Sequence, residues 1–165
     1  SIKHGLEERG FNVKVIFLMR DPIERCWSML RMDRRERLRM HPNEVFLDEE
    51  EQLERVFSTR AYELRTKYEF TVKNLERVFD QDNIFYSLYE SLFEEKTVNE
   101  LKSFINVSDF MPDINRRENV SNKRKSLLEV NDELSFKIFD HYRDTYEFCE
   151  KRFGVKELWP GWRYS

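Results

Sequence analysis

Two arginines and a serine near the start of the chain, Arg20, Arg25 and Ser28, have the side chains that bind phosphate groups. Arginine offers paired N–H donors and serine a short hydroxyl donor. Arg25 and Ser28 are three residues apart, so on a helix they share one face. The pattern predicts a phosphate site. The alternative is that Arg20 pairs with Asp21 or another carboxylate and that Ser28 is only a surface hydroxyl.

The residues around Arg20 predict the junction between a strand and a helix. Residues 13–19 are almost wholly apolar, which is typical of a central strand covered on both faces. Asp21 suits the N-cap of the next helix and Pro22 its first position. Ligands of open α/β sheets bind beyond the carboxyl ends of strands, and the N–H groups of a helix N-terminus attract anions. We therefore expect this N-terminus to contribute to the phosphate site.

The following residues alternate between helical patterns and breaks. Residues 31–55 hold a basic run and an acidic run separated by a breaker, which predicts a solvated, charged excursion or, alternatively, a lip over the substrate. A second strand is predicted at residues 84–88, and the aromatic tail at 158–162 is expected to pack down as a plug. Helices are predicted at residues 1–10, from 22 onward, and at 59–79, 97–105 and 132–153.

Two of these helices have a clear apolar face. The face at 59–79 consists of Leu64, Tyr68, Val72, Leu75 and Phe79, and the face at 132–153 consists of Leu134, Ile138, Tyr142, Tyr146, Cys149 and Phe153. In the helix after Pro22 the apolar positions are Ile23, Cys26, Trp27 and Leu30. The order of strands and helices argues for an α/β protein with parallel strands.

Length and composition narrow the class of protein. The 165 residues and 39% apolar content predict one domain, and the net charge of −3 indicates neither nucleic-acid nor membrane affinity. No membrane-spanning run is present. Cys26 and Cys149 predict buried free thiols, with a disulfide as the alternative. His41 and His141 lie far apart without a ligand cluster, so no metal site is expected.

The run Arg20-Asp21-Pro22-x-x-Arg25-x-x-Ser28, after an apolar strand, resembles a motif of the sulfotransferases. That family uses it to hold the 3′-phosphate of 3′-phosphoadenosine 5′-phosphosulfate. In the family the arginine at the strand end and the later serine contact this phosphate, and these positions match Arg20 and Ser28. The resemblance thus implies that both residues bind the nucleotide and that Arg25 supports them.

Two further segments extend the resemblance over residues 11–162. Residues 68–93 are similar to the family's helix, strand and Tyr-Glu segment, which implies that Tyr89 lies near the adenine. The basic loop at 121–125 matches the place where the family closes over the nucleotide, which implies that Lys123 or Lys125 binds it. The family's fold is a P-loop NTPase-like α/β domain, with a parallel sheet flanked by helices. This implies one such domain over residues 1–165, rich in helix and incomplete at its N-terminus.

The resemblance implies transfer of a sulfuryl group to a hydroxyl or amine of a carbohydrate, peptide or small molecule. The co-substrate would be 3′-phosphoadenosine 5′-phosphosulfate, with no metal and no nucleic acid involved. The family's Gly- and Lys-containing loop is not found before Val13, and no general base is assigned, because we interpret His4 as a helix-surface residue. The lack of a membrane anchor favours the cytoplasm. The acceptor and the oligomeric state are left open.

Two other classes of function stay open. One is a binding module that holds a nucleotide or an anion at the same residues without chemistry. The other is a mostly helical interaction domain whose charged segment, residues 31–55, contacts a partner.

Overall fold

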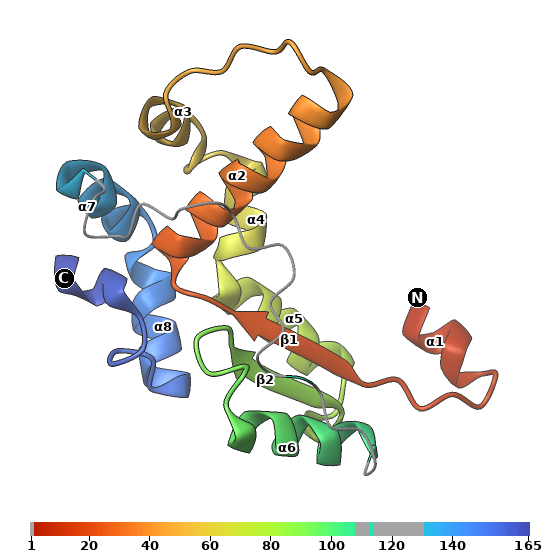
Figure 1. Cartoon of the computed structure of the whole chain (residues 1–165). Coiled ribbons are helices and arrows are strands. Elements are labelled where there is room, and N and C mark those ends of the chain that lie inside the picture. Colours follow the sequence, from red (N-terminus) through yellow and green to blue (C-terminus); the bar gives the residue numbers. More distant parts are fainter. Residues whose placement is uncertain (1, 108–112, 114–130) are drawn as a thin grey trace. The chain divides into compact units, whose positions relative to one another are not determined.

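The computed structural model describes residues 2–107, 113 and 131–165 (Figure 1). This part of the chain is a helix-rich mixed α/β protein with a small two-stranded parallel sheet, which confirms the predicted class at that level. In chain order its elements are α1 (Ile2–Glu7), β1 (Val15–Met19), α2 (Pro22–Met40), α3 (Glu49–Val56), α4 (Arg60–Thr66), α5 (Tyr68–Val78), η1 (Gln81–Asn83), β2 (Ile84–Leu88), α6 (Glu95–Ile105), α7 (Asp132–His141), α8 (Arg143–Phe153) and η3 (Pro160–Tyr164).

The described residues fall into two compact units. Unit 1 comprises residues 2–19, 71–107 and 113, and unit 2 comprises residues 20–70 and 131–165. The division passes between Met19 and Arg20 and again within α5. The expectation of a single domain over the whole chain stays a prediction, as does the P-loop topology.

Unit 1 contains the sheet. β1 and β2 run parallel and in register, from Val15 opposite Ile84 to Met19 opposite Leu88. The backbone N–H of Tyr89 donates to the Met19 carbonyl at 2.7 Å and so continues the ladder past the end of β2. Both predicted strands are confirmed, and β2 has the predicted bounds.

One face of β1 is more open than the sequence suggested. Ile16 and Leu18 are 46% and 42% exposed, whereas Met19 is buried. The expectation of a strand covered on both faces is therefore wrong for this structure. Branched and aromatic residues favour a strand whether one face or both are covered, so the sequence pattern could not separate the two cases.

Within unit 1, helix α6 packs on β2. The Phe104 ring lies 5.4 Å from the Phe85 ring, and the Lys14 ammonium lies 5.0 Å from the same Phe104 ring. Lys14 also donates to the Phe104 carbonyl. The charged end of Lys14 is thus held by α6 while its stem lies along apolar surface.

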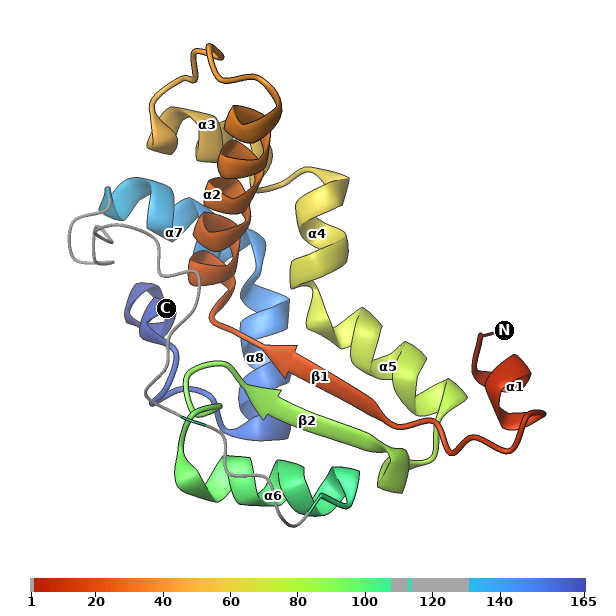
Figure 2. The same ribbon diagram turned by 45° about the vertical axis from the view of Figure 1, so that its right-hand side comes forward.

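Unit 2 is built around α2, which packs against α3, α4 and α7 (Figures 1 and 2). The buried side of α2 contains the predicted apolar stripe, including Cys26 and Trp27. Cys26 and Cys149 are both buried free thiols, as predicted. Burial raises the pKa of each thiol to about 12, so neither is a reactive thiolate at neutral pH.

The charged segment at residues 31–55 is more regular than predicted. Helix α2 continues through the basic run to Met40, and the acidic run forms α3 with Asp48 as its N-cap. Arg, Glu, Leu and Met all have high helix propensity, and exposed ion pairs such as Arg37–Glu44 accompany the helices. Leu53 is fully buried and fixes α3 to the rest of unit 2.

Two long predicted helices are each broken into two. The break at Lys67 separates α4 from α5, and Leu64 is 68% exposed although it was placed on the apolar face. Tyr62 and Thr66 are buried instead. The second break is at Tyr142, whose hydroxyl donates to the Phe57 carbonyl at 2.5 Å. The apolar spacing of the sequence continues through this break, so the spacing alone predicts one helix. The tertiary contact outweighs that local preference.

The other predicted elements agree with the structure. Helix α1 ends before Gly10, which has φ of 81°, and α6 starts two residues earlier than predicted. On the predicted apolar face of 132–153, Phe153 is half-buried and the other members are buried. Within the described residues, no helix is long and apolar enough to cross a bilayer.

Candidate functional site

The backbone of the predicted phosphate site is fixed at Arg20. The Tyr68 hydroxyl donates to the Arg20 carbonyl at 2.9 Å and accepts from the Arg20 N–H at 3.3 Å. Tyr68 is buried, and its ring lies 6.2 Å from that of Trp159. Arg20 is therefore held at a defined position immediately before α2.

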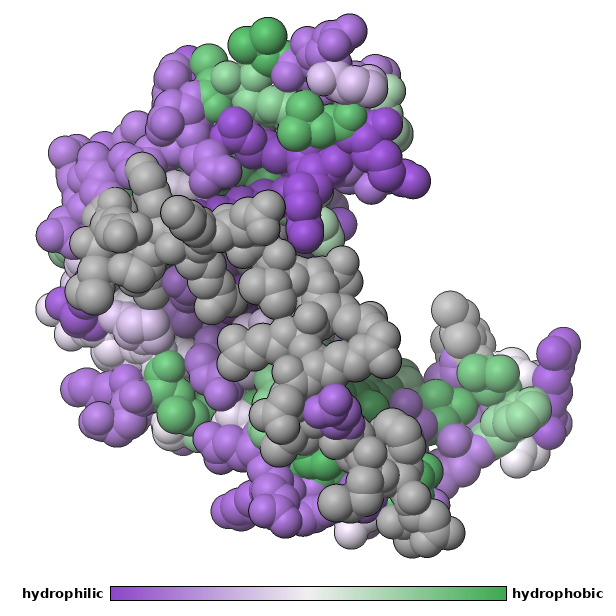
Figure 3. Space-filling view, in the orientation of Figure 1, coloured by the Kyte–Doolittle hydropathy of each residue, from purple (hydrophilic) through white to green (hydrophobic). Residues whose placement is uncertain are grey.

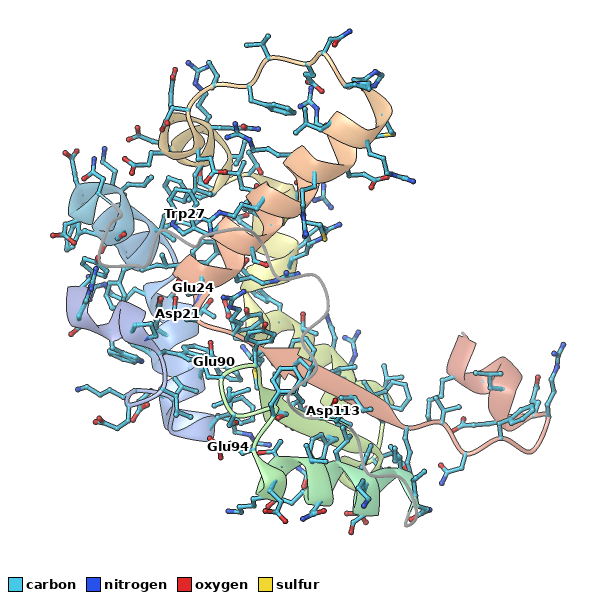
Figure 4. The ribbon with its side chains drawn as sticks, in the orientation of Figure 1. Asp21, Glu24, Trp27, Glu90, Glu94 and Asp113 are labelled. Carbon is cyan, nitrogen blue, oxygen red and sulfur yellow. The ribbon has the colours of Figure 1, made fainter. Side chains whose placement is uncertain are left out.

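The next residue, Asp21, lies at the start of α2 (Figure 4). Its carboxylate links three separate segments of unit 2. Its Oδ1 accepts from the N–H groups of Ile23 and Glu24, at 2.9 and 3.1 Å, and from the Tyr146 hydroxyl at 3.0 Å. Its Oδ2 accepts from the Gly161 N–H at 2.7 Å. The predicted N-cap is confirmed, and the same side chain also holds α8 and the C-terminal segment.

The first-turn N–H groups of α2 are already engaged in the structure. Pro22 has no N–H, the N–H groups of Ile23 and Glu24 donate to the Asp21 side chain, and that of Arg25 donates to the Asp21 carbonyl at 2.8 Å. Asp21 thus satisfies donors that the end of a helix otherwise leaves open. The expected contribution of this N-terminus to phosphate binding stays a prediction.

Burial dominates the electrostatics of Asp21, which has no exposed surface. Desolvation raises the pKa of the Asp21 carboxyl from 3.8 to about 6, although the hydrogen bonds from Gly161, Glu24 and Tyr146 lower it. The nearby charge of Glu24 raises the pKa further.

The aromatic tail packs down as predicted. Trp159 is 1% exposed, and its ring lies 5.7 Å from that of Tyr146. Trp162 lies 5.7 Å from Tyr146 on an edge-to-face approach. A Cβ at Gly161 would lie 2.7 Å from Asp21 Oδ2 and closer still to the Tyr146 hydroxyl, so the close approach requires glycine.

The Arg20 side chain forms an ion pair with the next turn of α2. Its Nη2 lies 2.5 Å from Glu24 Oε2, and the two side chains are 14% and 23% exposed. This pairing matches the structural alternative stated for Arg20. It also fixes the orientation of the Arg20 guanidinium.

Arg25 and Ser28 differ from Arg20. Both are half-buried on the first two turns of α2, and neither side chain makes an ion pair or a hydrogen bond within the described residues. A half-buried cation and hydroxyl without partners, three residues apart, suit an anion that approaches one helix face.

The other predicted nucleotide ligands are Tyr89, Lys123 and Lys125. Tyr89 belongs to unit 1, where it is 39% exposed and lies edge-to-face with Phe93 at 6.3 Å. Lys123 and Lys125 lie outside the described residues, as does most of the irregular segment predicted at 106–126.

No metal centre is found in the described ranges 2–107, 113 and 131–165, where no three His, Cys, Asp or Glu side chains form a ligand group. His141 Nε2 lies 3.0 Å from Glu63 Oε1, which also accepts from Lys67 at 2.8 Å. The hydrogen bond and charge of Lys67, with a smaller contribution from His141, lower the pKa of the Glu63 carboxyl. This cluster is a structural tie between α4 and α7.

Comparison with protein-family models, with curated proteins and with solved structures finds no match to this chain. The function is therefore inferred from the chain's own residues.

Sequence reasoning found Arg20, Asp21, Arg25 and Ser28 but missed the groups that hold them. Tyr68 and Tyr146 were assigned to the core by their spacing, and their hydroxyls gave no separate signal. The Pro160-Gly161 pair in an aromatic tail is the one signal that could have indicated a close backbone approach.

Proposed function

We propose that this chain binds 3′-phosphoadenosine 5′-phosphosulfate and serves sulfuryl transfer from it to a hydroxyl or amine acceptor. The observation that carries the proposal is the pair Arg25 and Ser28. Both are half-buried and have no partner among the described residues, one and two turns after a fixed Arg20. The strand–Arg-Asp-Pro–helix order, which resembles the sulfotransferase motif, gives the ligand its identity.

The side chains of Arg20, Arg25 and Ser28 would all bind the 3′-phosphate. Arg20 would donate from the part of its guanidinium that does not face Glu24, Arg25 would add a second charge, and Ser28 a short hydroxyl donor. Asp21 takes no part in contact with the ligand. It keeps α2 in place by engaging the N–H groups of its first turn.

In the reaction the acceptor oxygen or nitrogen forms a bond to sulfur, and the bond from sulfur to the bridging phosphate oxygen breaks. The products are the sulfated acceptor, 3′-phosphoadenosine 5′-phosphate and a proton. The proposed ligands lie at the 3′-phosphate, so they orient the nucleotide and do not touch the reacting sulfur.

A calorimetric titration tests the proposal. The chain is titrated with 3′-phosphoadenosine 5′-phosphate and, separately, with adenosine 5′-phosphate at one fixed salt concentration. We expect clear preference for the 3′-phosphorylated ligand. The preference should fall by about tenfold or more in Arg25→Ala and in Arg20→Ala, because each removes a charge-assisted contact.

The matched control is Arg35→Ala, an exposed arginine farther along the same helix. It removes the same charge without touching the first two turns of α2, so the preference should persist. Ser28→Ala keeps the net charge and removes only the hydroxyl donor, so it should also lower the preference for the 3′-phosphorylated ligand. Equal affinity for the two ligands, or equal loss in the control and test variants, contradicts the proposal.

A nucleotide-binding module without transfer is the second candidate. It needs only the phosphate-binding side chains Arg20, Arg25 and Ser28, which lie at the 3′-phosphate and away from the reacting sulfur. Binding with a 3′-phosphate preference but no release of 3′-phosphoadenosine 5′-phosphate from the phosphosulfate, across alcohol and amine acceptors, would support this candidate over the transferase.

A further inference from the structure

A pocket of about 320 Å³ lies where α2, α3 and α4 meet, within unit 2. It falls in the charged segment for which the sequence left a substrate lip open. Its apolar lining comes from Leu30 and Val56, and its polar lining from Asp33, Gln52 and Tyr62. Figure 3 shows hydrophilic and hydrophobic side chains intermixed over this region of α2 and α3.

Two further lining residues carry charges that are already paired outside the pocket. Glu36 pairs with Arg39 at 2.6 Å, and Arg37 Nε donates to Glu44 at 3.1 Å. These pairs neutralise the rim, so the rim by itself attracts neither anions nor cations strongly.

The three polar groups of the lining have no partner of their own. Asp33 makes no ion pair or hydrogen bond within the described residues, and Gln52 Oε1 is a buried oxygen without a donor. Tyr62 is only 4% exposed, and its hydroxyl likewise makes no hydrogen bond to another described residue. A buried polar atom without a partner, such as Gln52 Oε1, is costly, and together with the two other unpartnered groups it indicates a ligand.

Each of the three groups comes from a different helix. Asp33 is on α2, Gln52 on α3 and Tyr62 on α4. The Asp33 charge is close enough to Tyr62 to raise the pKa of its hydroxyl, after the larger effect of burial. The groups therefore converge on one space from three sides.

We propose that this pocket binds the ammonium group of a small organic amine with an apolar body. An ammonium has three N–H donors, and the pocket offers three acceptors in Asp33, Gln52 and Tyr62. The unpaired negative charge of Asp33 selects a cation over a neutral group, and Leu30 and Val56 cover the carbon stem. An anion would be repelled by the unpaired Asp33 carboxylate.

The inference goes beyond the proposed nucleotide site and does not depend on it, because no residue of the pocket belongs to that site. If the chain does transfer sulfuryl groups, the amine would be a candidate acceptor or the anchor of one. Either proposal can fail while the other holds.

The test compares 2-phenylethylammonium with 2-phenylethanol, two probes that share the apolar body and differ in charge and donors. Binding to the chain is followed by calorimetry and by the amide resonances of Gln52 in a nitrogen-labelled sample, without nucleotide. We expect the ammonium probe to bind and to shift the Gln52 resonances, and the alcohol to bind at least about tenfold more weakly.

Asp33→Asn should weaken binding of the ammonium by about tenfold, since it removes the charge and keeps the size of the side chain. Glu51→Gln removes a carboxylate of α3 that pairs with Arg55 and does not line the pocket, so it should leave the affinity unchanged. Equal affinity for the two probes, no binding of the ammonium, or unchanged binding in Asp33→Asn would overturn the proposal.

Discussion

The charged residues at the two ends of helix α2 differ in burial and in how many groups they hold. At the first turn, a single carboxylate without exposed surface accepts four hydrogen bonds and joins α2, α8 and the C-terminal segment. Near the last turn, ion pairs such as Arg39–Glu36 lie in solvent, with side chains 75% and 52% exposed.

The comparison indicates which charged contacts of α2 fix the geometry of unit 2. A buried carboxylate that accepts hydrogen bonds on both oxygens restricts its partners to one arrangement, and losing it leaves buried donors unpaired. An exposed pair exchanges with water at little cost and fixes little. The first turn therefore sets the geometry of the proposed phosphate site, and the distal half of α2 is free to carry a different function.

The largest expected effect comes from removing the buried cap. Asp21→Ala should lower the free energy of unfolding by about 3–5 kcal/mol, because it deletes the N-cap and leaves the buried donors of Tyr146 and Gly161 unpaired. Chemical denaturation followed by circular dichroism measures the change.

Asp48 provides the matched control, as the N-cap of α3 whose side chain accepts from the Glu50 N–H at 2.9 Å in an exposed position. Asp48→Ala should cost about 1 kcal/mol, the usual value for an N-cap. Similar losses in the two variants would mean that the buried links of Asp21 add nothing to its role as a cap.

The cap at Asp21 was readable from sequence, whereas its tertiary role was not. Local chemistry determines the first part, because Asp before Pro and an apolar stripe is a helix start wherever it occurs. The partners Tyr146 and Gly161 are far along the chain, and no local pattern records which buried hydroxyl meets which carboxylate.

The same distinction explains the errors elsewhere in the fold. Strand β2 and helix α6 follow from nearby residues, but the breaks at Lys67 and Tyr142 interrupt patterns that are locally continuous. Of the candidate site, the positions of Arg20, Arg25 and Ser28 could be predicted. The Arg20–Glu24 pair was foreseen only as one of several alternatives, since side-chain choice among carboxylates depends on packing.

The second prediction is that the free energy of unfolding depends on pH through Asp21, by an amount similar to or smaller than the loss in Asp21→Ala. The pKa of Asp21 is about 6 in the folded chain and near 3.8 when unfolded, so between these values the folded state binds the extra proton. Stability should then fall as pH rises from about 4 to about 6, by about 3 kcal/mol from this group. Below about pH 4, Asp21 is protonated in both states and no longer makes stability depend on pH.

Denaturation midpoints at a series of pH values, for the wild type and Asp21→Asn, isolate this contribution. The asparagine does not titrate, so the difference in stability between the two proteins should change across the window in favour of the variant as pH rises. A constant difference from pH 4 to pH 7 would contradict a raised pKa at Asp21.

The smallest expected effect sharpens the comparison at the proposed phosphate site itself. Glu24 competes with an incoming phosphate for the Arg20 guanidinium, and its negative charge opposes an anion. Glu24→Gln should therefore raise the affinity for 3′-phosphoadenosine 5′-phosphate by about two- to fivefold, the size expected for a partly exposed ion pair. Glu51→Gln is the control, because Glu51 and Arg55 form a pair with the same spacing and the same 2.5 Å distance on α3. A change confined to Glu24→Gln would identify Arg20 as a phosphate ligand for which Glu24 competes. Unchanged affinity in both variants would make the Arg20–Glu24 pair purely structural and leave anion binding to Arg25 and Ser28.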